Sequence, residues 1–264
     1  MPVITITTEW KTNDFYYGII KGKLCNQCPG IPVVDNATGI PVFNIAHASF
    51  VIRNTYRNYP EGSVHLICIH SERSEDKKHL IVKARGHYFI GTDNGIFNLI
   101  LNSPADEIIS LEPGDNEDEL DVFARAASEV IAGKEISTLG IKQKDFNEKV
   151  PYRATIDKNV IIGSVIFIDS YGNAITNITR EVFSRVFEKN HFRIQIQSNK
   201  HYTEHISIRY GDEPVGDLLA RFNSLDLLEL AINGANISEL LSLSVGSSVR
   251  VDNTGNKSSP DKLF

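Results

Sequence analysis

Strand-like and helix-like patterns alternate along the first half of the chain. Residues 3–7 alternate apolar and polar positions, and residues 64–69 form an almost unbroken apolar run after Gly62. An unbroken apolar run of this length is typical of a strand buried on both faces. The same patterns predict further strands over 79–84 and 88–91, and helices over 15–24, 43–56 and 121–132. This alternation predicts an α/β domain with a mostly parallel sheet.

The pattern changes after a polar stretch that ends near Pro151. Strands dominate beyond it, and residues 191–197 alternate strictly, as a half-buried antiparallel strand does. The expected strands are 160–168, 192–197, 205–210, 227–232 and 248–251. We therefore divide the chain into an α/β N-terminal domain (1–145), a linker (146–156), a smaller β-rich domain (157–252) and a polar tail (253–264). The C-terminal domain is predicted to be mainly antiparallel, either a sandwich or a barrel.

Composition narrows the class of protein. The chain has 264 residues, 41% of them hydrophobic and 23% charged, which suits a globular protein with a substantial core. No apolar run approaches the ~20 residues that a membrane span requires, and no secretion signal is expected at the N-terminus. The formal charge of −6, without a basic cluster, disfavours nucleic acid as a partner. We expect a cytoplasmic protein that handles a small molecule.

The cysteines and histidines do not suggest a metal site. Cys25 and Cys28 form a lone C-x-x-C at the end of a predicted helix, whereas a redox pair favours a helix N-terminus. Cys68 lies within a predicted strand, so a four-ligand zinc site is not indicated. His201 and His205 would be ~13 Å apart on one strand face. We interpret the three thiols as packing groups and predict no metal.

Polar residues follow several of the predicted strands. In an open α/β sheet, ligands bind beyond the carboxyl ends of the strands. The groups expected there are Glu9, Asp14, His70, Ser71, Asp93 and Asn94, and in the second domain Asp169, Tyr171 and Asn173. Carboxylates, amides and aromatic rings suit a polar, aromatic-containing, cationic ligand. This placement predicts a site but does not by itself indicate a reaction.

Four ordered motifs resemble those of one known family. They are I-T-I-T-T-E-W-K-T-N-D-F-Y-Y-G-I-I-K-G (4–22), F-I-G-T-D-N-G-I-F (89–97), G-S-V-I-F-I-D-S-Y-G-N-A-I-T-N-I (163–178) and N-S-L-D-L-L-E-L-A-I-N (223–233). Together they resemble the S-adenosylmethionine hydroxide adenosyltransferase family, which also contains fluorinating and chlorinating enzymes. The third motif is the most specific match.

The resemblance implies a nucleophilic substitution at the 5′ carbon of S-adenosylmethionine. Water or hydroxide would attack, and methionine would leave as a neutral thioether, giving adenosine and L-methionine. Such a leaving group needs no general acid, so the site has mainly to position the reactants and exclude bulk water. The resemblance implies no cofactor beyond this substrate. It also implies a homotrimer, with each site between the N-terminal domain of one subunit and the C-terminal domain of its neighbour.

The resemblance also implies roles for individual substrate-binding residues. Glu9 stands where the family has an Asp that holds the ribose hydroxyls, and Phe43 corresponds to an aromatic beside the ribose and sulfonium. The other predicted contacts are Asp14 and Asp169 for the α-ammonium group, Ser224 for the carboxylate, and Tyr171, Asn173 and the backbone of Gly234 for adenine. Asp93 and Asn94 are expected to line the site, although Asp93-Asn94-Gly95 is also a turn sequence.

The reaction centre departs from the family pattern. His70 occupies the position of an Asp, Lys77 that of an Arg, and Asp118 that of a His. Because Asp and His have exchanged places, we hypothesise that His70 accepts a proton from water, with Asp118 and Lys77 assisting. Asp118 could instead only cap the following helix.

The altered centre leaves three functions open. An S-adenosylmethionine hydrolase is the first interpretation. A sensor or pseudoenzyme that binds the ligand without hydrolysing it is the second, and an S-adenosylmethionine-dependent halogenase is the third.

Overall fold

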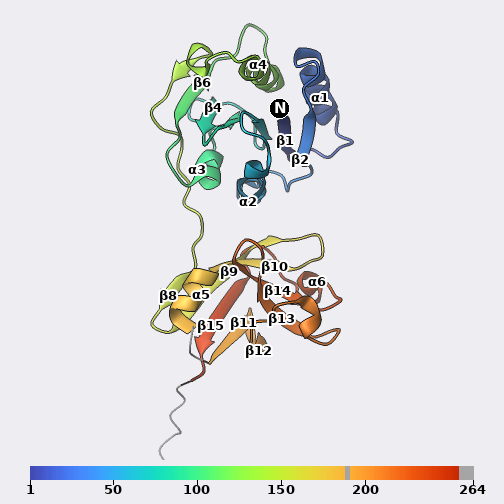
Figure 1. The fold of residues 1–264 in the computed structure, drawn as a ribbon, viewed down its shortest axis with the longest axis vertical. Helices are drawn as coiled ribbons and strands as arrows, with labels where there is room; N and C mark the ends of the chain where they lie inside the picture. The colour runs from blue at the N-terminus through green and yellow to red at the C-terminus, as the bar shows by residue number, and fades with distance from the viewer. Residues whose placement is uncertain (188–190, 256–264) are drawn as a thin grey trace, which may run out of the picture. The chain divides into compact units, whose positions relative to one another are not determined.

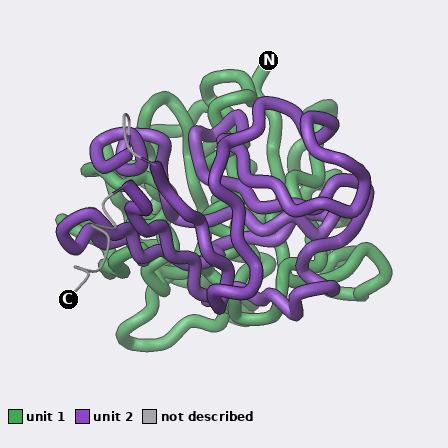
Figure 2. The backbone as a smooth tube through the Cα atoms, turned by 90° about the horizontal axis from the view of Figure 1, so that it is seen from below, with its two compact units in different colours: residues 1–151 green, residues 152–264 purple. Residues whose placement is uncertain are grey.

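The computed structural model describes residues 1–187 and 191–255. The chain forms two compact units, divided between Pro151 and Tyr152 (Figure 2). Residues 146–149, within the predicted linker, contact the first unit: Phe146 packs against its core, and Asn98 donates a side-chain hydrogen bond to the backbone of Lys149 at 2.8 Å.

The first unit is built on a seven-stranded sheet (Figure 1). Its strands are β1 (Ile4–Thr8), β2 (Val33–Ala37), β3 (Val64–Cys68), β4 (His79–Ala84), β5 (His87–Thr92), β6 (Glu107–Leu111) and β7 (Ile141–Lys142), in the order β2-β1-β3-β5-β4-β6-β7. The pairs from β2 to β5 are parallel, and the pairs from β5 to β7 are antiparallel. The predicted α/β class is therefore confirmed, with the parallel strands on the side that carries β1 and β3.

Helices cover both faces of this sheet (Figure 1). One face carries α1 (Phe15–Gln27) and α4 (Glu119–Ile131), and the other carries α2 (Ile45–Thr55) and α3 (Ile96–Leu101). Two short 3₁₀ helices are η1 (Tyr56–Asn58) and η2 (Ile136–Thr138). Large side chains are fully buried on each side, among them Phe123 of α4 and Phe97 of α3. Truncating either ring to Ala would cost about 3–5 kcal/mol of stability.

The second unit is an antiparallel sheet that curls toward a barrel. Its strands are β8 (Thr155–Asp157), β9 (Val160–Ile168), β10 (Ala174–Thr179), β11 (Phe192–Ile196), β12 (Ser198–Thr203), β13 (Leu218–Phe222), β14 (Leu227–Ile232) and β15 (Ser248–Asn253). The order is β12-β11-β15-β9-β10-β14-β13, with β8 beside β9, and the end strands β12 and β13 lie close together. Short helices α5 (Arg180–Phe187), η3 (Tyr210–Asp212) and α6 (Ile237–Leu240) complete it.

One predicted strand is wrong. Residues 205–209 are not in a strand, and Tyr210 begins η3. The backbone N–H groups of Ile208 and Arg209 donate to the carboxylate of Asp212 at 2.9 and 2.8 Å. This local side-chain acceptor replaces a ladder partner, so the segment turns despite its apolar alternation. The neighbouring strand is β12, from Ser198 to Thr203.

Three sequence-based expectations concern membrane-spanning helices, cysteines and metal sites. None of the helices in the described ranges is long and apolar enough to cross a membrane. The three cysteines are unbonded, and burial raises the pKa of Cys68 to about 12, so its thiol is protonated at neutral pH. Within 1–187 and 191–255, the structure contains no cluster of three or more His, Cys, Asp and Glu side chains suited to a metal ion.

Candidate functional site

Three predicted site residues, two of them substrate-binding and one catalytic, meet at the carboxyl ends of β1 and β3. Glu9 follows β1, Phe43 precedes α2, and His70 follows β3. The Glu9 carboxylate accepts the Phe43 N–H at 2.7 Å and the His70 N–H at 3.2 Å. The rings of Phe43 and His70 lie edge to face, with centroids 4.9 Å apart. Glu9 therefore fixes two loops, and the rings that these loops carry contact each other.

Both loops hold a strained residue at this point. Phe43 has φ 61° and His70 has φ 48°, in the left-handed region that costs a non-glycine residue about 1–2 kcal/mol. Phe43 is also 65% exposed, so burial of its ring does not compensate for this strain. Strained, exposed aromatic residues of this kind are common at functional sites.

Asp14 begins the neighbouring helix. Its carboxylate caps α1 by accepting the Tyr16 N–H at 3.1 Å. Trp10 and Tyr16 stack at 5.7 Å, and Phe15 is 66% exposed beside them. A capping carboxylate uses one of its ~four acceptor positions here, so Asp14 retains the capacity to bind a cationic group.

Further polar groups lie where β3 and β5 end. The carbonyl oxygen of Ser71 lies 2.9 Å from His79 Nε2 and accepts the Thr92 hydroxyl at 2.8 Å. Asn94 is buried, donates to the Ile69 carbonyl at 3.0 Å and accepts the Ile96 N–H at 3.2 Å. These bonds fix the edge of the sheet, and Asn94 serves mainly to order the start of α3.

Asp93 holds residue 147 of the first unit. Its carboxylate accepts the Asn147 N–H at 2.9 and 3.1 Å, and the Asn147 amide returns a hydrogen bond to the Asp93 carbonyl at 2.7 Å. Burial raises the pKa of Asp93 above its ordinary value, while the Asn147 N–H partly offsets that effect. The observed role of Asp93 is thus structural.

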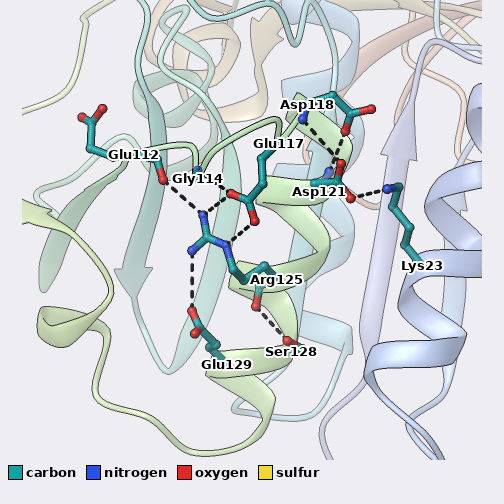
Figure 3. Close-up of polar contacts among 9 residues, drawn as sticks. All are labelled: Lys23, Glu112, Gly114, Glu117, Asp118, Asp121, Arg125, Ser128 and Glu129. Atoms are coloured by element: carbon teal, nitrogen blue, oxygen red, sulfur yellow. Dashed lines mark hydrogen bonds and ion pairs between the residues drawn. The ribbon is translucent and has the colours of Figure 1, made fainter.

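Asp118 is a helix cap. It accepts the Asp121 N–H at 2.8 Å and returns its own N–H to the Asp121 carboxylate at 3.4 Å, forming a capping box at the start of α4 (Figure 3). Lys23 on α1 donates to Asp121 and lowers the pKa of that carboxyl, which ties the two helices together. Arg125 binds Glu117 through two nitrogens at 2.8 Å and orders the loop before the helix.

The hypothesised catalytic trio is not connected in the structure. Lys77 forms a tight turn with Ser74, their backbones exchanging hydrogen bonds at 3.1 and 3.2 Å. In the described part of the chain, no hydrogen bond or ion pair joins His70 to Lys77 or Asp118. Of the three, only His70 lies in the cluster with Glu9 and Phe43.

In the second unit, the turn between β9 and β10 is organised by Asp169. Its carboxylate accepts the Tyr171 N–H and the Asn173 N–H, each at 2.9 Å, and the Asn173 side-chain amide at 3.0 Å. Gly172 has φ 82°, and a Cβ there would lie 1.9 Å from the Asn236 side chain, so only glycine fits. Asp169 therefore presents Tyr171 outward, 79% exposed, and Asn173 inward, 6% exposed.

This turn forms one wall of a pocket of about 670 Å³. Tyr171, Asn173 and Gly234, the three residues predicted to contact adenine, all line it. The remaining lining residues are Tyr210, Ile232, Ala235 and Asn236. A pocket of this size with one apolar wall, two rings and two amides matches the general character of small-ligand sites.

Tyr210 is the main lining residue that the sequence motifs did not identify. Its hydroxyl donates to the buried carboxylate of Glu229 at 2.5 Å, and the Arg221 guanidinium lies 4.6 Å from its ring centroid. Burial, followed by the Glu229 contact, raises the pKa of Tyr210 to about 12. The ring is thus held by a hydrogen bond and a cation–π contact. The only available signal was the apolar alternation that wrongly predicted a strand there.

Ser224 lies away from this pocket. It is exposed in the turn between β13 and β14, whereas Gly234 follows β14. The six residues of β14 separate the two, and a strand of that length spans about 20 Å. Within the second unit, Ser224 therefore does not join the pocket that Tyr171, Asn173 and Gly234 share.

Comparison with known families agrees with the motifs. The model of the SAM hydroxide adenosyltransferase N-terminal domain matches residues 4–140, and that of the C-terminal domain matches residues 163–250. The chain therefore belongs to the SAM hydroxide adenosyltransferase family.

Individual relatives cover almost the whole chain. An (R)-S-adenosyl-L-methionine hydrolase of Methanocaldococcus jannaschii is 26% identical and covers 92% of this chain and 93% of its own length. A protein of the same name from Thermus thermophilus is 25% identical and covers 95% and 100%. The fold is similar to that of an uncharacterized conserved protein from Thermotoga maritima, with a TM-score of 0.84 and 22% identity. The match covers 95% of this chain and 100% of that one.

Proposed function

We propose that this protein hydrolyses S-adenosyl-L-methionine at the 5′ carbon, releasing adenosine and L-methionine. The observation that carries the proposal is the junction of Glu9, Phe43 and His70 at the carboxyl edge of the first sheet. Three segments separated in sequence contribute to one small surface there. The relatives named as hydrolases of this substrate support the same function.

The Glu9 carboxylate still has acceptor positions for the ribose hydroxyls. A carboxylate offers about four acceptor positions, and the two backbone N–H groups occupy one on each oxygen. The remaining positions suit a pair of vicinal hydroxyls. The exposed Phe43 ring beside them can attract the sulfonium through its π face, a contact of about 0.5–2 kcal/mol.

The second unit supplies a matching purine site. Tyr171 and Tyr210 offer flat surfaces, and Asn173 and the Gly234 backbone offer donors and acceptors for a base edge. We propose that the predicted homotrimer brings this pocket from one subunit to the Glu9 surface of a neighbouring subunit. Light scattering of the purified protein tests the trimer, for which a mass three times that of the chain is expected.

Water activation is the step at which the chain departs from the family pattern. His70, to which the sequence pointed as proton acceptor, lies at the ligand face beside Phe43 and can orient the attacking water there. Asp118 caps α4 and Lys77 lies in a separate turn, so neither is assigned a direct part in proton transfer. Replacing His70 with Ala, followed by measurement of adenosine release, tests its role.

One experiment separates hydrolysis from ligand binding alone. Purified protein is incubated with S-adenosylmethionine, and adenosine and methionine are quantified by chromatography. The proposal expects both products in equal amounts, at a rate proportional to protein concentration. A thermal shift with the ligand but without either product would instead identify a binding protein.

A further inference from the structure

His79 has a defined proton arrangement. It is the first residue of β4 and is 2% exposed. Its Nε2 lies 2.9 Å from the Ser71 carbonyl oxygen, which can only accept a hydrogen bond. Nε2 therefore carries the proton, and the lone pair of the neutral ring is on Nδ1.

That lone pair and the hydroxyl of Ser71 both lack partners. His79 Nδ1 and Ser71 Oγ are buried, and neither has a hydrogen-bond partner in the described ranges. An unsatisfied buried polar group costs about 1–3 kcal/mol, so two of them in residues that already contact each other require an explanation. A small molecule that donates to Nδ1 and contacts Oγ would satisfy both.

These groups lie at the ligand edge of the sheet. Ser71 directly follows His70, and its carbonyl also holds Thr92 at the end of β5. Because β4 is antiparallel to β5, its first residue lies beside the last residue of β5, and His79 pairs with Thr92 in the ladder. His79 is thus at the same edge as the surface formed by Glu9, Phe43 and His70.

The surroundings keep His79 uncharged. Burial lowers its pKa most, the Ser71 carbonyl opposes this effect, Arg73 lowers the pKa further, and Glu119 on α4 raises it. The Phe123 ring, also on α4, lies edge-on at 4.8 Å. A neutral imidazole whose Nδ1 lone pair has no hydrogen-bond partner can accept a proton from a water bound there.

We propose that Ser71 Oγ and His79 Nδ1 bind the attacking water and that His79 accepts its proton. The inference rests on the proposed hydrolase function. The water oxygen forms a bond to the 5′ carbon, and the carbon–sulfur bond breaks with its electron pair passing to sulfur. One water proton moves to Nδ1 and is later released to solvent, so the products are adenosine, neutral thioether methionine and a proton. This assigns to His79 the transfer for which the sequence pointed to His70.

The proposed water site at Ser71 Oγ and His79 Nδ1 also favours water over a halide as the nucleophile. Nδ1 is an acceptor and needs a donor opposite it. Water can donate a hydrogen bond, whereas chloride and fluoride can only accept one. A halide facing this lone pair would be repelled, so the arrangement favours hydrolysis over halogenation. Adding either halide should leave adenosine as the nucleoside product.

Two substitutions test the assignment. His79→Gln keeps an amide N–H for the Ser71 carbonyl but cannot take up a proton. We expect kcat to fall at least about 100-fold while KM stays within about threefold, because a general base acts on the chemical step. His87→Gln is the matched control, because His87 is also a buried strand histidine but begins β5 at the opposite edge. It should retain wild-type kcat.

The outcomes separate the two proposals. A smaller fall in kcat for His79→Gln would overturn the inference while leaving the hydrolase function intact. If His79→Gln does not fold, Ser71→Ala decides, because it retains the carbonyl that binds His79. It should lower kcat about tenfold or more with KM unchanged, and an unaltered kcat would overturn the inference. Wild-type protein that releases no adenosine would refute the hydrolase function and, with it, this assignment.

Discussion

Glu9 and Phe43 are 34 residues apart in sequence, yet the Glu9 carboxylate accepts the Phe43 backbone N–H at 2.7 Å. The same carboxylate accepts the N–H of His70, so one side chain sets the conformation of two loops. This arrangement connects the shape of the candidate ligand surface directly to a residue that is proposed to bind the ribose.

Replacing Glu9 with Gln should weaken S-adenosylmethionine binding. A carboxamide has one acceptor oxygen in place of two, so one of the two loop N–H groups loses its partner. We expect the dissociation constant to rise about tenfold or more, corresponding to about 1.4 kcal/mol. Isothermal titration measures this directly. Glu135→Gln, at an exposed residue directly before η2, is the matched control, and an equal loss of affinity there would contradict the explanation.

Substitutions of Phe43 should affect ligand binding and stability differently. Glycine adopts φ 61° without the cost of about 1–2 kcal/mol that a side chain incurs, although its unfolded state is more flexible by about 0.5–1 kcal/mol. Phe43→Gly should therefore keep the free energy of unfolding within about 1 kcal/mol of wild type while weakening ligand binding. Phe43→Ala should be less stable than Phe43→Gly. Urea unfolding and titration of both variants provide the test, and tight binding by Phe43→Gly would exclude the ring from the site.

The sequence predicts which residues lie at the first-unit site better than it predicts the hydrogen bonds between them. Strand periodicity and the rule that ligands bind at carboxyl ends indicated Glu9 and His70, because both follow strongly patterned strands. The sequence also allows Asp118 simply to cap the following helix, and the structure shows that role. The bonds from Glu9 to Phe43 and His70 depend on side-chain reach across a folded sheet, which no local pattern encodes.

In the second unit, the sequence pattern predicts one local structure correctly and another wrongly. The motif predicts the Asp169–Asn173 turn, but the alternation of apolar and polar positions around Tyr210 predicts a strand that the structure does not contain. The Asp212 carboxylate captures two backbone N–H groups of that segment and prevents pairing. Local side-chain capture of the backbone overrode the apolar alternation.

Tyr210 should contribute to nucleoside binding. Stacking of a base on an aromatic ring is worth about 1–3 kcal/mol, so Tyr210→Ala should weaken adenosine binding about tenfold or more. Tyr152→Ala, at a residue that is 89% exposed, should leave affinity unchanged. Fluorescence or calorimetric titration with adenosine measures both variants. Equal affinities for the two would remove Tyr210 from the pocket's function.

Tyr210→Phe tests the support of the ring. It keeps the aromatic surface but leaves the buried Glu229 carboxylate without its hydroxyl donor, at a cost of about 1–3 kcal/mol of stability. The double variant with Glu229→Gln should recover part of this loss, since the buried charge is also removed. Denaturant unfolding of the single and double variants gives the coupling energy, and strictly additive losses would contradict this account.

Stability should fall as the pH drops below neutrality. Burial, together with the neighbouring His87, lowers the pKa of His65 to about 3, well below its ordinary value of 6.5. Because the folded-state pKa is depressed, this contribution is fully present above pH 6.5 and is lost as the pH falls toward 3. The titration of His65 alone should lower the free energy of unfolding by about 2 kcal/mol as the pH falls from 7.5 to 5.

Urea unfolding at pH 7.5, 6.5 and 5 checks this expectation before most carboxylates titrate. His65→Gln should lose less stability over that range than wild type does. Burial also lowers the pKa values of His47, His79 and His87, so some pH dependence should persist in the variant. An identical pH dependence in both proteins would show that His65 does not titrate as its burial requires.

The chemical step offers the most direct test of the whole account. S-adenosylmethionine is incubated with protein in water enriched in oxygen-18, and the nucleoside product is analysed by mass spectrometry. We expect adenosine with one labelled oxygen, at the 5′ position, formed together with an equal amount of methionine. Intact substrate after incubation with folded protein, or a product without label, would contradict attack by water at that carbon.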